Sequence, residues 1–430
     1  MPNEYQPLLT NDNHHMNNHH ATDNPDLYQL PNPRNRINFK TSLKNAFTSS
    51  SLNVLLIFIP FGIISALFNM SDTTIFLCNF IGIIPLAKLL GYSTEELSLR
   101  TSETVGGLLN STFGNAVELI IGVMALKNGL IDVVQSSMVG SLLSNLLLVL
   151  GMCFFCGGIK YKYQTFNSTS SNTSASLLVM TIFMVVLPVA FNHEDMDKED
   201  DHSRVLQFSR YTSVIMLIMY SLYLLFQLKT HARYFKSNNN TNQIFIRSNS
   251  MEYESLSQQR RNEEEGRQEA EPENPEEATL SLSFAITLLF VVTVVISICA
   301  EFLVDSIEGI SQNWNLSPSF VGLILLPIVG NAAEHVTAIT VALKNKMDLA
   351  IGVALGSSMQ VSLMVIPFLV ITGWVIGVDL SLVFNLFETV IIFVSVLIVN
   401  QLINDGKSNW LEGAMLLSAY SIIAIAYWLI

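Results

Sequence analysis

The chain has 430 residues, of which 50% are apolar and only 13% are charged, and its formal net charge is −13. A soluble protein carries about 25% charged residues, so this chain has about half the charge that a water-facing surface needs. We therefore expect a membrane protein. The acidic balance argues against nucleic acid as a partner, because phosphate binding needs clustered Lys and Arg. The four cysteines lie inside apolar runs, which predicts small core residues rather than disulfides or metal ligands.

Long apolar stretches separated by polar or Gly/Pro residues predict an all-α polytopic membrane protein. A helix needs about 20 mostly apolar residues to cross a hydrocarbon core of about 30 Å. Eleven such stretches occur: 51–69, 73–91, 104–126, 131–157, 176–192, 206–228, 280–303, 319–343, 348–372, 380–400 and 409–429.

The distribution of Lys and Arg along the chain predicts its orientation, because cytoplasmic loops hold the excess of these residues. If the N-terminus is cytosolic, 18 of the 22 Lys and Arg residues fall on the cytosolic side. The C-terminus then lies on the far, lumenal side.

Two polar segments flank or interrupt the spans. The first 50 residues lack an apolar signal-peptide core and are rich in Asn and His, which predicts a disordered cytosolic tail. Within this tail, Glu4 to Leu9 resembles an acidic dileucine signal, through which sorting adaptors would direct the protein to a vacuolar or related acidic membrane. The cytosolic loop at 231–279 is strongly acidic in its second half and divides the chain into two halves.

One short string occurs in both halves, as GNAVE at 114–118 and as GNAAE at 330–334. The same offset of 216 residues pairs Asp132 with Asp348, Gly140 with Gly356, and Ser141 with Ser357. The first string lies in the third stretch and the second in the eighth, an odd interval of five, so the copies cross the membrane in opposite directions, as in the inverted repeats of secondary transporters. We expect an extra helix at 51–70, a first five-helix repeat at 71–230 and a second at 280–430.

Each string places a carboxylate, Glu118 or Glu334, within an apolar span, where a charge is costly and usually functional. Asn115 and Asn331 precede these glutamates by three residues and therefore share a helix face with them. Gly114 and Gly330 are expected to break their helices and free backbone carbonyls. Inverted symmetry would bring the two faces together at the membrane midplane.

These residues predict a cation site made of oxygen ligands. Two carboxylates, backbone carbonyls, and hydroxyl and amide oxygens suit Ca²⁺, which takes about 6 to 8 oxygens in flexible geometry. The predicted site consists of Glu118, Glu334, Asn115, Asn331, Gly114, Gly330, Ser141, Ser144, Ser357 and Gln360. Without its cation the site would hold two buried like charges, which favours protonation and suggests exchange of a cation for protons. His335, beside Glu334, is open to interpretation as a proton relay or as a helix-packing residue.

The strings NSTFGNAVE at 110–118, PIVGNAAEH at 327–335 and GSSMQ at 356–360 resemble those of the vacuolar Ca²⁺/H⁺ exchangers (CAX) of the Ca²⁺:cation antiporter superfamily. The resemblance covers roughly residues 50–430. It implies that Glu118 and Glu334 bind the cation, that Ser141, Ser144, Ser357 and Gln360 line the site, and that the proton gradient drives Ca²⁺ from the cytosol into an acidic organelle. It implies no cofactor, only Ca²⁺ and H⁺ as transported substrates.

Other functions remain as alternatives. An intramembrane enzyme would need a nucleophile with its base or a zinc-binding HExxH motif, and the sequence has neither. A Ca²⁺ channel fits paired inverted repeats less well than an exchanger does. Oxygen ligands suit Mn²⁺ as well as Ca²⁺, so an exchanger for Mn²⁺ or another cation stays open. The proton stoichiometry and the oligomeric state, including a possible homo-oligomer, are also left open by the sequence.

Overall fold

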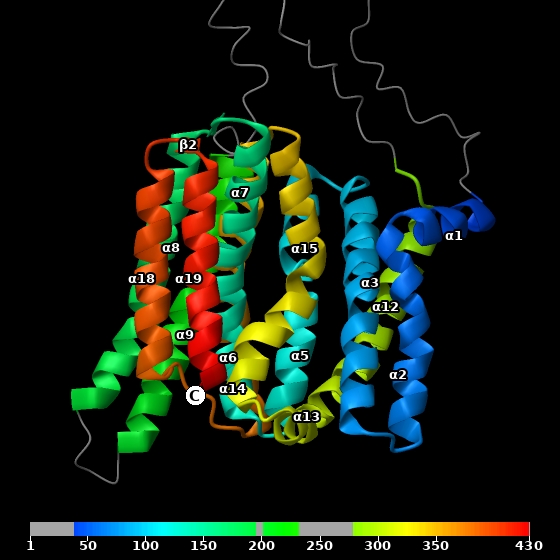
Figure 1. Ribbon diagram of the computed structural model, residues 1–430, viewed down its shortest axis with the longest axis horizontal. Coiled ribbons are helices and arrows are strands. Elements are labelled where there is room, and N and C mark those ends of the chain that lie inside the picture. Colours follow the sequence, from blue (N-terminus) through cyan, green and yellow to red (C-terminus); the bar gives the residue numbers. More distant parts are fainter. Residues whose placement is uncertain (1–37, 195–200, 232–277, 430) are drawn as a thin grey trace, which may run out of the picture. The chain divides into compact units, whose positions relative to one another are not determined.

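The computed structural model describes residues 38–194, 201–231 and 278–429. The predicted sorting signal at Glu4 to Leu9, most of the N-terminal tail and nearly all of the acidic loop lie outside these residues. The described chain is an all-α membrane bundle (Figure 1). In the described part, nine helices are long and apolar enough to cross a membrane, or up to eleven if each of two bent pairs counts as one span.

The first half of the bundle begins with a short helix that the sequence did not predict. Its helices are α1 (Phe39–Thr48), the 3₁₀ segment η1 (Ser51–Ile57), α2 (Phe58–Leu67), α3 (Asp72–Ser98), α4 (Glu103–Phe113), α5 (Ala116–Lys127), α6 (Ile131–Leu143), η2 (Ser144–Val149), α7 (Leu150–Lys160), α8 (Ser168–Glu194), α9 (Asp201–Leu225) and η3 (Phe226–Thr230). The segments η2 and η3 are π-helical.

The second half repeats the pattern. It comprises α12 (Leu282–Asp305), α13 (Ile307–Trp314), α14 (Pro318–Phe320), η5 (Val321–Leu325), α15 (Leu326–Leu343), α16 (Met347–Gln360), η6 (Val361–Val365), α17 (Ile366–Ile376), α18 (Leu386–Ile403) and α19 (Trp410–Leu429). The segments η5 and η6 are π-helical. A π-turn thus follows α6 and α16 directly in both halves, and such turns are frequent at functional sites.

Helix α1 corrects the expectation that the first 50 residues are a disordered tail. Its axis bends by 96° from that of η1 and α2. Ser42 and Ala46 are buried on its inner face, and Asn45 donates a hydrogen bond of 3.0 Å to the Thr279 carbonyl. Composition suggested disorder, but these contacts with the start of the second half supply the burial that orders the helix.

The two ends of the bundle carry different connections. The strands β1 (Gln164–Thr165) and β2 (Lys407–Ser408) pair antiparallel and join the connection after α7 to the one before α19. They lie at the same end as α1, whereas α19 finishes at the opposite end (Figure 1). We call the end with β1 and β2 the ribbon end. Its connections include Lys160, Lys162 and Lys407, and it is the end that the sequence predicts to be cytosolic.

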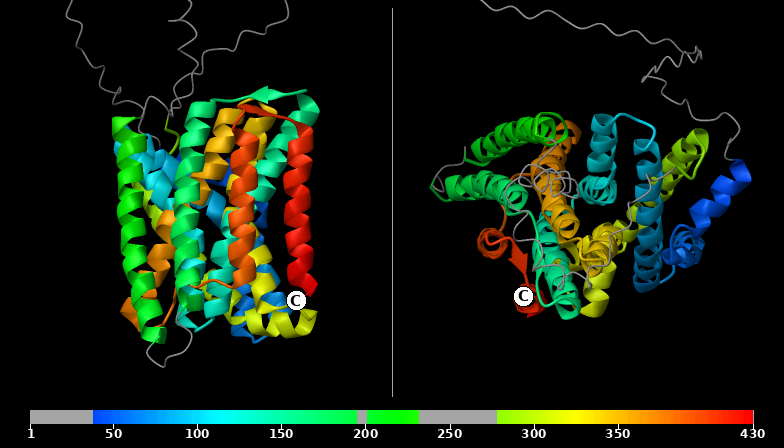
Figure 2. Two further views of the ribbon diagram at one scale, coloured as in Figure 1. Left: turned by 90° about the vertical axis from the view of Figure 1, so that its left-hand side faces the viewer. Right: turned by 90° about the horizontal axis from the view of Figure 1, so that it is seen from above.

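The most deeply packed helices are the two that follow the repeated strings. Leu142, Leu143, Leu146 and Leu147 are inaccessible along α6 and η2. Helices α2, α3 and α12 pack together on one side of the bundle (Figure 2). Large apolar side chains such as Phe290 remain exposed on the outer helices, which is the surface that a bilayer would cover.

Candidate cation site

The two intramembrane glutamates come from α5 and α15. Helices α4 and α5 form one of the two bent pairs: the chain turns by 43° at Gly114 and Asn115, so Glu118 lies in the first turn of α5. Both carboxylate oxygens of Glu118 and the Oε2 atom of Glu334 are buried without a hydrogen-bond partner. Buried polar atoms are almost always hydrogen bonded, so these unpartnered carboxylate oxygens mark a candidate binding site.

The glycines of the two strings allow the carboxylates to cross between the halves. A Cβ atom on Gly330 would lie 3.0 Å from Oε1 of Glu118, and one on Gly114 would lie 3.5 Å from Oε1 of Glu334. Each carboxylate therefore lies beside the glycine of the opposite repeat, a reciprocal placement that follows from the inverted symmetry. The absence of a side chain at Gly330 leaves room for the Glu118 carboxylate, whereas a Cβ atom on Gly114 would make only an ordinary contact with Glu334.

Only one of the two predicted helix breaks is present. Gly114 ends α4, as expected, but Gly330 lies inside the continuous helix α15, so the expectation for Gly330 was wrong. In the second half the irregularity comes earlier, in the π-turn η5 just before Pro327. Proline lacks an amide hydrogen and is tolerated in the first turn of a helix, so Pro327 favours the change in hydrogen bonding at that point.

Amide side chains link the two halves around the glutamates. Asn115 donates a hydrogen bond of 2.6 Å from Nδ2 to Oε1 of Gln360, and its own Oδ1 is buried without a partner. Asn331 is also buried, and its Nδ2 has no partner. The structure thus brings Asn115 and Gln360, two residues of the predicted site, into contact.

Asn145 is a site residue that the sequence reasoning missed. It is buried in η2 and donates a hydrogen bond of 3.0 Å from Nδ2 to Oγ of Ser357. Ser357 in turn hydrogen bonds to the Glu334 carboxylate. Asn145 has no polar counterpart in the second half, where Val361 stands, so the repeat comparison could not find it; its signal was a lone amide within an apolar run.

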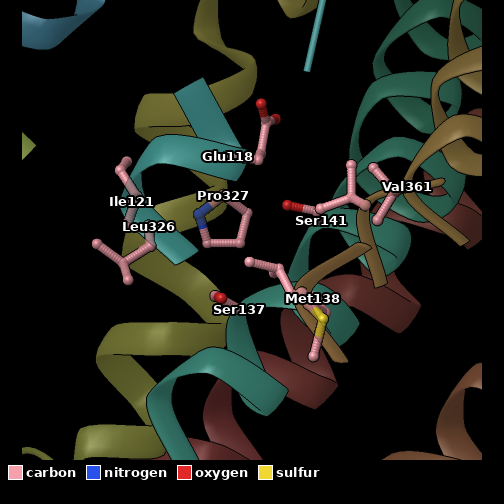
Figure 3. A pocket seen from close by; sticks show the side chains of 10 residues that line it. Glu118, Ile121, Ser137, Met138, Ser141, Leu326, Pro327 and Val361 are labelled. Atoms are coloured by element: carbon pink, nitrogen blue, oxygen red, sulfur yellow. The ribbon is translucent and has the colours of Figure 1, made fainter. Parts of the chain in front are cut away.

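The remaining hydroxyl groups lie in two different places. Ser141 and Glu118 line one small cavity of about 20 Å³, and Figure 3 shows the Ser141 hydroxyl pointing from α6 toward Pro327. Ser144 instead lies 3.3 Å from Nε2 of the buried His335. Ser144 is therefore turned toward this histidine, and the contact is compatible with both interpretations of His335.

A larger cavity of about 300 Å³ reaches Glu334 from the ribbon end. We call it the vestibule. It is lined by the C-terminal half of α3, by α4 and α5 around Gly114, by α15 and by Val353 of α16. The cavity beside Glu118 has room for about one water molecule. Access to the two carboxylates is therefore unequal between the two ends of the bundle.

The described residues contain no group of three or more His, Cys, Asp or Glu side chains suited to a metal ion. A cation at this site would have two carboxylates and would take its other ligands from neutral oxygens. That donor set suits a hard divalent cation, since two carboxylates balance its charge in a medium of low dielectric.

These features define a helical membrane protein with the inverted-repeat architecture of secondary transporters. The chain belongs to the sodium/calcium exchanger protein family, whose model matches residues 71–229 and 284–429. The family resemblance and the fold predicted from the sequence are thereby confirmed.

Curated relatives and a solved structure match over most of their length. A vacuolar calcium ion transporter of Schizosaccharomyces pombe is 44% identical over 89% of this chain and 86% of its own. A Ca²⁺/H⁺ antiporter of Aphanothece halophytica is 41% identical over 87% of this chain and 95% of its own. The structure of native YfkE superposes with a TM-score of 0.70 and 35% identity, covering 88% of this chain and all of YfkE.

Proposed function

We propose that the protein exchanges cytosolic Ca²⁺ for protons across the membrane of a vacuole or related acidic organelle. Glu118 and Glu334 bind the cation and the protons alternately. The observation that carries the proposal is the pair of carboxylates: three of their four oxygens are buried without a partner, and each carboxylate lies beside the glycine of the opposite repeat. The relatives named as Ca²⁺/H⁺ antiporter and vacuolar calcium ion transporter support the choice of ions and of membrane.

The coupling follows from charge neutrality. A site with two carboxylates is neutral either with one divalent cation or with two protons, and an uncompensated charge in the membrane interior is costly. If only neutral states change their exposure between the two sides, loading of Ca²⁺ requires release of protons. The vestibule supports cation entry from the ribbon end, which the Lys and Arg distribution assigns to the cytosol.

Uptake of ⁴⁵Ca into acid-loaded vesicles that contain the purified protein tests the proposal. Glu118→Gln and Glu334→Gln keep the size of the side chain but remove its charge, so each is expected to lower proton-driven uptake at least about 100-fold. Glu388→Gln is the matched control: Glu388 is also buried within the bundle, but its carboxylate accepts a hydrogen bond of 2.8 Å from Ser136. We expect this variant to retain uptake.

The same vesicles distinguish the alternatives. Uptake that is independent of the pH gradient would contradict proton coupling and favour a channel. Uptake that persists in both site variants would contradict the assignment of Glu118 and Glu334. Competition of ⁴⁵Ca uptake by Mn²⁺ at equal or lower concentration would identify Mn²⁺ as the preferred cation, because both ions accept oxygen ligands.

A further inference from the structure

The two repeats adopt different arrangements despite their common sequence pattern. Residues related by the offset of 216 differ sharply in exposure: Val105 and Leu108 of α4 are each 46% exposed, whereas their counterparts Val321 and Ile324 in η5 are 0% and 7% exposed. Segment η5 thus packs inside the bundle, whereas the corresponding part of α4 is exposed on its surface.

The helix surfaces on which η5 and α4 would pack, on α6 and α16, differ in exposure in the same way. Segment η5 packs on α6, where Val133 is 1% exposed. The counterpart of Val133 is Leu349 on α16, which is 44% exposed. The stripe on α16 that corresponds to the packed surface of α6 is therefore uncovered, and Val353 on this stripe lines the vestibule.

A glycine marks the closest approach in the packed half. A Cβ atom on Gly140 of α6 would overlap the backbone carbonyl of Leu323 in η5. One on Gly322 would lie only 2.9 Å from the Val133 carbonyl. The backbones of α6 and η5 can come this close only because both residues lack a side chain.

The equivalent glycine in the other half faces open space. Gly356 of α16 is the counterpart of Gly140, and a Cβ atom there would meet no atom within 4 Å. Its expected partners on α4 are Gly106 and Gly107, the counterparts of Gly322 and Leu323. In this structure they pack elsewhere: Gly106 faces Ser98, and Gly107 faces Leu228 of η3.

We infer that α4 closes the vestibule by docking on α16, with the Gly107 carbonyl seated on Gly356 as the Leu323 carbonyl is seated on Gly140. The two glycines then form a pair of alternating contacts: one is made when access is from the ribbon end, and the other when access is from the opposite end. This inference rests on the proposed exchange function and assigns a specific positioning role to Gly356.

A methyl group at Gly356 is the direct test. Gly356→Ala leaves the present arrangement undisturbed, because nothing lies within 4 Å, but its Cβ would overlap the α4 backbone in the closed arrangement. We expect Ca²⁺ binding by the purified protein, measured by calorimetry, to stay within about twofold, while the maximal rate of ⁴⁵Ca uptake falls at least about tenfold.

Gly352→Ala is the matched control on the same helix. A Cβ atom there also meets nothing within 4 Å. Its counterpart in the packed half is Ser136, which already carries a side chain next to Gly322. The closed arrangement should therefore accept alanine at 352, and this variant is expected to transport at the rate of the unmodified protein.

The opposite end provides an independent readout. Ser137 lines the small cavity of about 20 Å³, which is too small for a maleimide, so Ser137→Cys should react slowly with a membrane-impermeant maleimide. Adding Gly140→Ala should speed this reaction, because the methyl group pushes Leu323 off α6. If Gly140→Ala does not fold, the uptake rates of Gly356→Ala and Gly352→Ala still test the glycine contact.

The outcomes separate the two proposals. If the unmodified protein fails to exchange Ca²⁺ for protons, the proposed function is wrong. If it exchanges these ions and Gly356→Ala does so at the same maximal rate, or if Gly352→Ala is impaired equally, the glycine contact is wrong. Unchanged maleimide reactivity in a folded Gly140→Ala protein would likewise contradict it.

Discussion

Gly330→Ala isolates the contact between a helix glycine and the carboxylate of the other repeat. The new Cβ atom would lie 3.0 Å from Oε1, 3.1 Å from Cδ and 3.2 Å from Cγ of Glu118. Ordinary contact begins at 3.4 Å, so the Glu118 carboxylate must move by about 0.4 Å. Binding groups need to be held within about 0.5 Å of their working positions, so this displacement reaches the tolerance of the site.

The expected result is a loss of affinity without a loss of stability. Alanine in the interior of a helix is more favourable than glycine by roughly 0.5–1 kcal/mol, so α15 should be at least as stable as before. We expect the KM for Ca²⁺ in acid-loaded vesicles to rise about tenfold, which corresponds to about 1.4 kcal/mol. Thermal unfolding of the purified protein should show an unchanged or higher midpoint.

The result is interpreted against Gly352→Ala, where the added methyl group has open space. That variant should change neither KM nor the unfolding midpoint by a measurable amount. An unchanged KM in a folded Gly330→Ala protein would show that Glu118 does not depend on this contact. A lowered midpoint would refute the reasoning about helix stability.

Two further changes probe the surroundings of the site. Asn145→Ala removes the donor to Ser357 and should raise the KM for Ca²⁺ about threefold to tenfold, since a hydrogen bond contributes about 0.5–1.5 kcal/mol; an unchanged KM would remove Asn145 from the site. Glu96→Ala removes a buried carboxylate that accepts from the Thr279 amide at 2.8 Å, and should cost about 3–5 kcal/mol of stability, measured as a lower unfolding midpoint. Its control is Glu301→Ala, which removes an exposed ion pair and should change the stability by less than about 1 kcal/mol. An equal shift of the unfolding midpoint in Glu96→Ala and Glu301→Ala would contradict a stabilising role for the buried carboxylate.

Much of the fold could be predicted because the bilayer restricts what a chain can do. Every backbone polar group in hydrocarbon must be satisfied within the protein, so long apolar runs become helices and their number sets the topology. All eleven predicted stretches correspond to helical segments of the structure. Helix α1 and the short α13 were missed, because each depends on tertiary contacts: Ala46 and Ile307 are buried by other parts of the bundle.

Candidate site residues could be proposed from the sequence, but their arrangement could not. The repeated strings located Glu118 and Glu334, because a charge is rare in an apolar span and a twofold pattern is rarer. The uninterrupted helix through Gly330 was not foreseen, since glycine permits a break without requiring one. Asn145 became recognisable only when its distance to Ser357 was known.

The sequence by itself determined the membrane class and the inverted repeat, because hydropathy and spacing act along the chain. Only the tertiary structure decided which end of the bundle is open. Gly140 and Gly356 occupy equivalent positions in the two repeats, yet one is tightly packed and the other faces open space. Two nearly symmetric sequences do not indicate which of the two surfaces is covered, because that depends on which helices pack against each other.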